Sequence, residues 1–281
     1  MIDIQPQNSS LLERLQLFVV ARPETYRHFE QKPFGIDVAE RFNPLKAGSE
    51  PFLALLENLD QVTFGPTGMP MPRWVFLDGS EMTGAVIGFG VQAEAAPPMA
   101  RQLLSVPPRY RGIVPYAMYI AIPTFEKGVW FGHNLASAAS LLPDQNLKGL
   151  GSLTKAIALK MYRAKEQVGA TQWTSKALYV HWRLGPMELS SAITPAHGED
   201  GTLTYRVVIN DDVLRHVGRD PRGKIPTHEP DEWLLSSDCA RIDAMQVDIE
   251  AGARYAIVGR PQAADGDAQQ LPIARLSPTA R

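Results

Sequence analysis

The sequence predicts a mixed α/β (α+β) fold with a C-terminal extension, and two kinds of pattern predict it. In some segments apolar residues recur with the spacing of an amphipathic helix. In others, β-rich runs follow one another across short turns, as the strands of antiparallel hairpins do. Taken in chain order, the expected elements are β-α-α-β-β-β-β-α-β-α-β-β, and no internal repeat is visible.

The composition is that of an ordinary globular protein with one large domain, or one domain and a smaller appendage. The chain has 281 residues, 44% hydrophobic and 21% charged, with a formal net charge of -2. This balance favours neither nucleic acid nor a membrane surface as a partner. The start of the chain has no secretory signal pattern, and no apolar run approaches the roughly 18 residues of a membrane span. We therefore expect a cytoplasmic protein.

The only cysteine, Cys239, can form no internal disulfide and rules out a cysteine-based zinc site. A small side chain packed under a short helix is the expected role of this residue. The histidines at 28, 197, 216 and 228 have no partner at metal-ligand spacing, so no metal site is predicted.

The N-terminal part predicts a strand and two helices. Residues 2–7 are expected to form the strand, and polar residues 8–10 offer N-caps for a helix over 11–20. A second helix is expected over 52–60, because Pro51 stands where the first helical turn begins. A hairpin over 73–92 follows, with Asp78-Gly79 at its turn.

The central part predicts an excursion and then further strands. Residues 93–112 are rich in alanine and proline and are expected to be an insertion. Two strands, 116–124 and 128–142, should follow. A helix follows the glycines of the next loop, a short helix is expected over 173–185, and a last hairpin over 187–210.

The C-terminal part predicts less regular structure. We expect a short helix over 211–217, a helix and strand within 236–259, and a tail over 261–281 that is disordered because it has few aromatic and β-branched residues. The expected organisation is therefore a domain over 1–210 with its core at 73–210, a small extension over 211–260, and the tail.

The stretch PDQNLKGLGSLTKAIALKMYRAKEQVGAT, residues 143–171, carries the most informative pattern. Gly149 and Gly151 allow positive φ angles and a close backbone approach, as needed where backbone N–H groups surround an anion. A helix-period apolar stripe follows at once and extends to Val168, so the free N–H groups of its first turn should face the loop. Basic residues at 148, 155, 160, 163 and 165 predict a positive surface. Taken alone, the two glycines are more typical of a tight turn before a helix than of an anion site.

The same stretch resembles the loop and helix of the GNAT family of acyl-CoA-dependent N-acyltransferases, from Pro143 through the Gly-Leu-Gly sequence and the amphipathic helix to Gly169-Ala170-Thr171. Residues 177–185 and the 73–92 hairpin are similar to further segments of the family, and together the likeness covers roughly 75 to 210. The layout is also similar to that of arginine N-succinyltransferase. The resemblance implies a central mixed, mostly antiparallel sheet flanked by helices.

The resemblance also implies which groups hold the co-substrate, acetyl-CoA or another acyl-CoA. In the family the loop's backbone amides hold the pyrophosphate of coenzyme A. Carried over to this chain, the binding residues are Leu141, Asn146, Lys148, Gly149, Leu150, Gly151 and Ser152. Asn146 departs from the family pattern, which has a longer glutamine or arginine at that position.

Three residues are candidates for the chemistry. His133 lies in an otherwise apolar or small-residue strand, and its imidazole has a pKa suited to accepting a proton from an attacking amine. A buried structural histidine is the other interpretation. The family's tyrosine, often the acid that protonates the leaving thiolate, falls on His181, with Tyr179 two residues earlier, and a surface histidine is the alternative there. Asp78 and Glu81 are weaker candidates for the base.

The expected activity is transfer of an acyl group from acyl-CoA to an amine of a small molecule, by direct attack. Two alternatives stay open: a GNAT-like domain that binds acyl-CoA or another nucleotide without transfer, and a decarboxylase of the acetoacetate type with Lys148 as Schiff-base lysine. The acceptor, the acyl length and the oligomeric state, a homodimer included, are left open by the sequence.

Overall fold

The computed structural model describes residues 9–67, 70–72, 85–194 and 201–277. The chain divides into two compact units. Unit 1 comprises residues 1–164 and 214–222, and unit 2 comprises residues 165–213 and 223–281. This division differs from the expected one, because the chain leaves unit 1 after the central helix and returns to it for one short segment.

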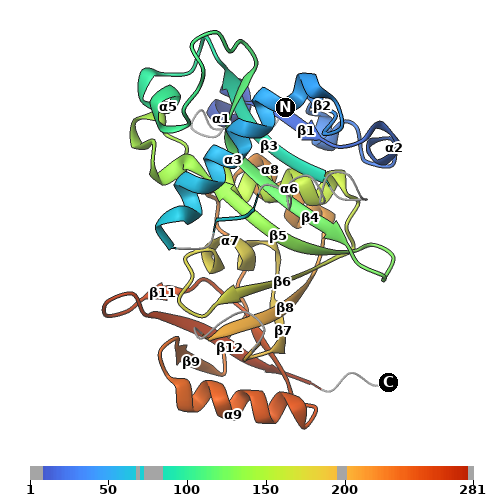
Figure 1. The fold of residues 1–281 in the computed structure, drawn as a ribbon. Coiled ribbons are helices and arrows are strands. Elements are labelled where there is room, and N and C mark those ends of the chain that lie inside the picture. The colour runs from blue at the N-terminus through green and yellow to red at the C-terminus, as the bar shows by residue number, and fades with distance from the viewer. Residues whose placement is uncertain (1–8, 68–69, 73–84, 195–200, 278–281) are drawn as a thin grey trace. The chain divides into compact units, whose positions relative to one another are not determined.

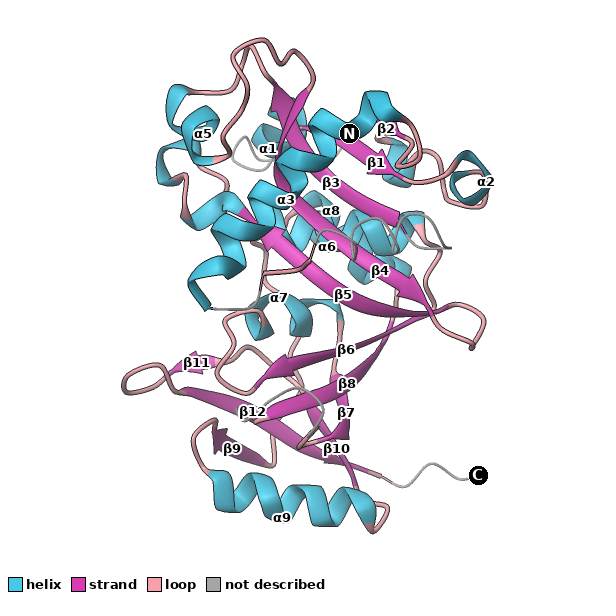
Figure 2. Ribbon diagram, viewed as in Figure 1, coloured by secondary structure: helices cyan, strands magenta, loops and turns pink. Residues whose placement is uncertain are grey.

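Unit 1 is a mixed sheet with helices on both faces (Figures 1 and 2). Its strand order is β5-β4-β3-β1-β2, with β1 and β2 parallel and the other neighbours antiparallel. The strands are β1 (Gln16–Val20), β2 (Val38–Phe42), β3 (Ala85–Gln92), β4 (Ile113–Pro123) and β5 (Val129–Ser137). The predicted mixed α/β fold, with a mostly antiparallel sheet flanked by helices, is confirmed.

The two longer helices of unit 1 cover opposite faces of this sheet. In Figure 2, α3 lies in front of the strands and α6 behind them. The helices are α1 (Ser9–Arg14), α2 (Pro23–Tyr26), α3 (Glu50–Phe64), α5 (Pro98–Leu103), α6 (Leu150–Met161) and α8 (Asp211–Arg219, in unit 1 from Leu214). Short 3-10 turns at 138–140 and 143–145 connect β5 to α6. This connection contains the predicted loop.

Unit 2 is also built on a sheet, in the order β11-β12-β10-β7-β8-β6, with β9 paired to β12. Its strands are β6 (Glu166–Gln172), β7 (Met187–Ser191), β8 (Thr202–Val208), β9 (Glu232–Leu235), β10 (Arg254–Ile257), β11 (Gln262–Ala263) and β12 (Gln269–Leu276). Its helices are α7 (Leu178–His181), continued by a 3-10 turn to Leu184, and α9 (Cys239–Glu250). The predicted final hairpin is present, as β7 and β8 pair antiparallel.

Three expectations for secondary structure were wrong. The helix predicted over 11–20 ends at Arg14, and its second half is strand β1, buried between β2 and β3. The helix predicted to reach Val168 ends at Met161, because Arg163 adopts a left-handed backbone (φ 53°) and the chain then enters β6. The tail predicted to be disordered contributes β12, which lies between β10 and β9.

Other expectations fall outside the described residues. The strand predicted over 2–7, and the first strand and turn of the 73–92 hairpin with Asp78 and Glu81, belong to that part of the chain. The described end of this hairpin is β3, whose neighbours are β1 and β4. The 93–112 excursion contains one short helix, α5.

Close packing in unit 1 depends on a glycine in β3. A Cβ on Gly88 would lie 2.1 Å from the carbonyl oxygen of Ala117 and 2.4 Å from the ring of Phe18. Phe18 is fully buried and makes an edge-to-face contact with Phe52, with ring centroids 4.9 Å apart. The missing side chain at 88 therefore lets an aromatic ring cover the sheet.

Gly88→Ala is expected to lower the free energy of unfolding by about 3 kcal/mol or more, because an added methyl group cannot fit without moving a paired strand. Urea unfolding measures this change. Gly48→Ala is the matched control, since a Cβ there meets no atom within 4 Å. Equal stability of the two variants would contradict the packing described for β3.

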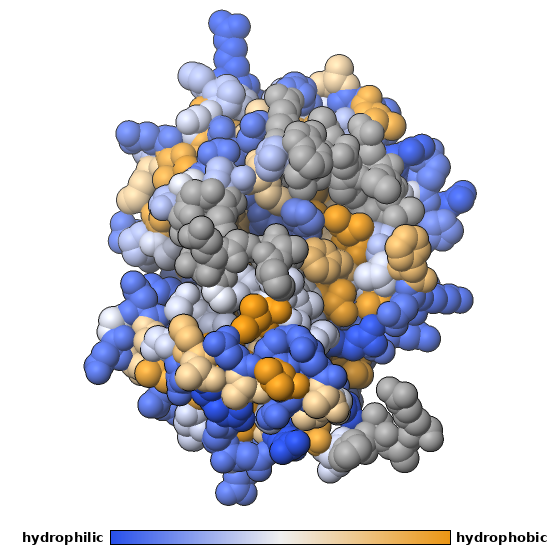
Figure 3. All heavy atoms as spheres, turned by 60° about the horizontal axis from the view of Figure 1, so that its bottom comes forward, coloured by the Kyte–Doolittle hydropathy of each residue, from blue (hydrophilic) through white to orange (hydrophobic). Residues whose placement is uncertain are grey.

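The surface carries scattered apolar side chains. On the face drawn in Figure 3, hydrophobic residues interrupt a largely hydrophilic surface. Among the described residues, no helix has the length and apolar character that crossing a membrane requires.

Candidate functional site

The loop before α6 has left-handed backbone at two positions. Asn146 (φ 48°) ends the 3-10 turn, and Gly149 (φ 91°) caps α6. Gly151 lies inside the first turn of the helix and has no positive φ, so the expectation of two left-handed glycines is correct for Gly149 alone. The loop therefore turns twice before the helix begins.

These turns leave a row of backbone donors to which no described residue offers an acceptor. Leu150 and Leu153 donate their N–H groups to the carbonyls of Leu147 and Gly149, at 3.0 Å each. Within the described part of the chain, no acceptor takes the N–H groups of the neighbouring residues 147–149, 151 and 152. First-turn N–H groups carry the positive end of the helix dipole. Such a row of donors is suited to an oxyanion.

Two arginines that the sequence analysis missed hold the loop from one side. Arg14 donates to the carbonyls of Gln145 (3.0 Å) and Asn146 (3.3 Å). Arg222 donates from Nε to the carbonyl of Lys148 (2.7 Å) and from Nη2 to Oδ1 of Asn146 (2.8 Å). Because N–H and C=O point in opposite directions across a trans peptide, the N–H groups of 147 and 149 point away from these arginines.

No sequence signal identifies Arg222, because it lies more than 70 residues from the loop in the chain. It follows α8, in the segment that returns to unit 1. The loop is packed against the same segment. A Cβ on Gly149 would lie 3.2 Å from the side chains of Pro221 and Arg222 and 3.3 Å from the Pro221 carbonyl. Glycine is thus favoured at 149 by its left-handed conformation, and the close neighbours leave little room for a side chain.

The remaining predicted binding residues divide by exposure. The side chains of Leu150 and Ser152 are buried, so these residues offer only backbone groups. Leu141 and Lys148 are exposed. Exposure of Lys148 gives no support to a Schiff-base role, because such lysines are activated by desolvation.

The predicted positive surface is smaller than expected, because Lys155 is fully buried. Its Nζ lies 5.8 Å from the centroid of the Tyr119 ring, which belongs to β4, a strand that α6 contacts. Burial penalises the charged amine and lowers the pKa of Lys155 well below its ordinary value. Helical periodicity assigned this lysine to the solvent face, whereas tertiary packing covers it.

Lys155→Met is expected to change the pH dependence of the free energy of unfolding, because it removes a group whose proton the unfolded chain binds more tightly than the native protein does. Between the lowered native pKa and 10.5, the ordinary pKa of lysine, the free energy of unfolding of the wild type should rise with pH relative to that of the variant. Unfolding curves at several pH values measure it. Lys176→Met, at an exposed site, is the control. A difference between the wild type and Lys155→Met that stays the same at every pH up to 10.5 would contradict this account.

His133 stands at an irregularity of β5. Asn134 pairs with Ile120 and Gly132 pairs with Ala121, so His133 is an extra residue between two pairs, a β-bulge. A β-bulge changes the direction of a side chain and leaves backbone groups of the extra residue unpaired. Bulges are frequent beside active sites. The side chain is exposed, but loss of hydration near the protein lowers the pKa of His133 from 6.5. The imidazole is therefore neutral at pH 7 and able to accept a proton.

The bulge is held by a carboxylate from α3. Asn134 donates from Nδ2 to Oδ1 of Asp60 (2.7 Å), and the other oxygen of Asp60 accepts the N–H of Met71. Asp60 is fully buried, and burial raises its pKa. Asp60 was not among the predicted site residues, although an acid directly after the apolar stripe of a helix is a visible signal.

Tyr179 and His181, the two candidate acids, both lie in α7 of unit 2, whereas His133 and the loop belong to unit 1. His181 is buried, with its ring centroid 5.3 Å from that of Tyr205, so the interpretation of a surface histidine is wrong. Tyr179 is half-buried, and the guanidinium of Arg260 lies 5.7 Å from its ring centroid. In the described ranges, no group of three or more His, Cys, Asp or Glu side chains is arranged to bind a metal.

The chain also has a structural likeness to a known protein. No protein-family model matches the sequence, and no curated protein matches it. Among solved structures, the chain is similar to the ribosomal-protein-S18-alanine N-acetyltransferase from Escherichia coli. The identity is 13% and the TM-score is 0.39, over 59% of this chain and 91% of that chain.

Proposed function

We propose that the chain transfers an acyl group from acyl-CoA to an amine of a small-molecule acceptor. The observation that carries the proposal is the row of backbone N–H groups at 147–149, 151 and 152, for which no described residue provides an acceptor. A pyrophosphate bears several oxyanions in a row, and backbone amides at a helix N-terminus bind such groups without a dedicated side chain. Arg14 and Arg222 keep the loop carbonyls turned away from this ligand.

The proposed chemistry needs no covalent enzyme intermediate. The amine nitrogen attacks the thioester carbonyl, a C–N bond forms, the C–S bond breaks, and coenzyme A leaves as a thiolate. His133 takes the proton that the amine loses, and the backbone at its bulge polarises the carbonyl. Tyr179 stays the proposed acid for the thiolate, on the family resemblance alone. His181 is the weaker choice because it is buried.

A thermal-shift screen with acetyl-, succinyl- and longer acyl-CoA tests the binding step. A ligand that binds the native state raises the melting temperature by mass action. We expect a shift with at least one species, and release of free thiol when an accepted amine is added. No shift with any species at millimolar concentration would overturn the proposal.

Binding without transfer is the second candidate, and the burial of His181 favours it. Under this function, acyl-CoA would raise the melting temperature, but no amine in a panel of small molecules would release thiol. The same screen followed by a thiol assay therefore separates the two functions.

A further inference from the structure

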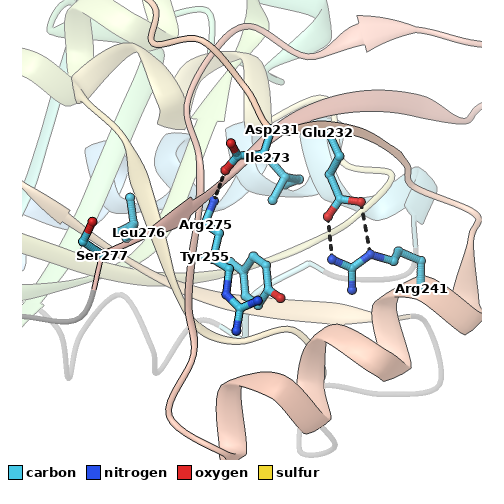
Figure 4. Close-up of a pocket in the computed structure, with 8 residues that line it drawn as sticks. All are labelled: Asp231, Glu232, Arg241, Tyr255, Ile273, Arg275, Leu276 and Ser277. Atoms are coloured by element: carbon cyan, nitrogen blue, oxygen red, sulfur yellow. Dashed lines mark hydrogen bonds and ion pairs between the residues drawn. The ribbon is translucent and has the colours of Figure 1, made fainter.

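Unit 2 contains a pocket of about 620 Å³ beside the beginning of β9, within the size range of small-molecule sites. Strands β9, β10 and β12 and helix α9 all contribute to it (Figure 4). Its lining residues are Asp231, Glu232, Arg241, Tyr255, Ile273, Arg275, Leu276 and Ser277. The two acidic and two basic side chains give the lining no net charge.

The floor of the pocket is apolar and fixed. Tyr255 and Ile273 are buried residues of adjacent strands. The Tyr255 hydroxyl donates to Oδ2 of Asp248 at 2.6 Å, which holds the ring in place. A ligand with an apolar or aromatic part would therefore meet a preformed surface here.

Two of the four charged side chains in the pocket, Arg241 and Glu232, form an ion pair with each other. Arg241 donates from Nε (3.1 Å) and Nη2 (2.6 Å) to the two oxygens of Glu232, a two-pronged pair that satisfies both oxygens (Figure 4). The ion pair is part of the pocket lining, and the charged groups of Asp231 and Arg275 remain for contact with a ligand.

The other two charged groups do not pair with each other. Arg275 stands opposite Tyr255 in the β10–β12 ladder, and its guanidinium lies 5.8 Å from the ring centroid. Asp231 accepts the backbone N–H of Arg275 on Oδ2, at 2.7 Å. Figure 4 shows the Arg275 side chain running away from that carboxylate and along the ring. Among the described residues, the guanidinium has no acidic partner and the second Asp231 oxygen has no donor.

We infer that this pocket binds a small zwitterion, a free amino acid with an apolar or aromatic side chain. The ligand carboxylate pairs with the Arg275 guanidinium, and the ammonium group donates to the free oxygen of Asp231. The side chain packs on Tyr255 and Ile273. A neutral lining with separate positive and negative groups matches a ligand that has both charges and no net charge. The inference uses residues of unit 2 alone and does not depend on acyl transfer.

Titration calorimetry with L-phenylalanine and two matched analogues tests the site. One analogue, 3-phenylpropanoate, lacks the ammonium group, and the other, 2-phenylethylamine, lacks the carboxylate. We expect phenylalanine to bind the full chain at concentrations below about 10 mM, and each analogue to bind about tenfold more weakly or not at all.

Two variants assign the contacts. Arg275→Met should lower the affinity for phenylalanine about tenfold, because the charge-assisted hydrogen bonds between the guanidinium and the ligand carboxylate are lost. Asp231→Asn keeps an oxygen that accepts the backbone N–H of Arg275. This variant should bind phenylalanine only as tightly as 3-phenylpropanoate, and its affinity for 3-phenylpropanoate should equal that of the wild type. Arg109→Met, an exposed arginine outside the pocket, should bind as the wild type does. The inference is overturned if the protein does not bind phenylalanine at about 10 mM, or if it binds phenylalanine and 3-phenylpropanoate with equal affinity. It is also overturned if both pocket variants bind phenylalanine as tightly as the wild type does.

Discussion

Replacing Gly149 by valine is expected to lower the affinity for acyl-CoA at least about 100-fold, while the protein stays folded. Gly149 has φ 91°, and its Cβ position is bounded by Pro221 and Arg222. A valine there forces the loop out of its double turn and disperses the donors at 147–149, 151 and 152. Loss of two charge-assisted hydrogen bonds, at about 1.5–3 kcal/mol each, accounts for a factor of this size. Calorimetric titration with acetyl-CoA measures it.

Gly252→Val is the matched control for this change. Gly252 has nearly the same backbone angle, φ 96°, but a Cβ there meets no atom within 4 Å. Both variants carry the strain of a β-branched residue in a left-handed position. Only Gly149→Val should lose binding. Retained affinity in Gly149→Val would show that the co-substrate does not use this loop.

His133→Gln is expected to lower kcat/KM for transfer by about 100- to 10,000-fold, the usual contribution of a general base. Affinity for acyl-CoA should change little, since the loop amides are unaffected. The wild-type rate should fall as the pH drops through the pKa of His133, and that acid limb should lie below pH 6.5, because lost hydration lowers this pKa. Steady-state rates over a pH series measure both effects.

His228→Gln, at an exposed histidine, is the control for this substitution. It should keep both the rate and the pH profile. An unchanged acid limb in His133→Gln, with only a small loss of rate, would assign the base to another group.

The sequence was informative where periodicity was strong and the neighbours were close in the chain. β4, β5, α3 and α6 were predicted because each has a clear apolar pattern between turn residues. Gly149 was predicted correctly, since a left-handed residue before a helix is commonly glycine.

Prediction failed where local patterns were ambiguous. Residues 15–20 form a short apolar run that fits a helix as well as a buried strand, and only pairing on both sides makes it β1. The end of α6 was missed because Arg163, not glycine, adopts the left-handed turn. β12 was missed because polar and small residues around it lower the average hydrophobicity, although Gln269, Leu271, Pro272 and Ile273 are all buried.

The candidate site could be predicted only in part for the same reason. His133 and the loop are neighbours in sequence order, joined by one strand and two turns. Arg222, Arg14 and Asp60 reach them from distant segments, and no spacing rule connects such residues. The burial of Lys155 likewise depends on what packs against α6.

The central claim is tested most directly by isothermal titration calorimetry that compares the affinity of the protein for coenzyme A with its affinity for pantetheine. Pantetheine keeps the thiol arm of coenzyme A and lacks the pyrophosphate and nucleotide. If the donors at 147–149, 151 and 152 hold the pyrophosphate, coenzyme A should bind at least about 100-fold more tightly than pantetheine, and Gly149→Val should remove most of that difference. Equal affinity of the two compounds, or an advantage of coenzyme A that persists in Gly149→Val, would contradict the account.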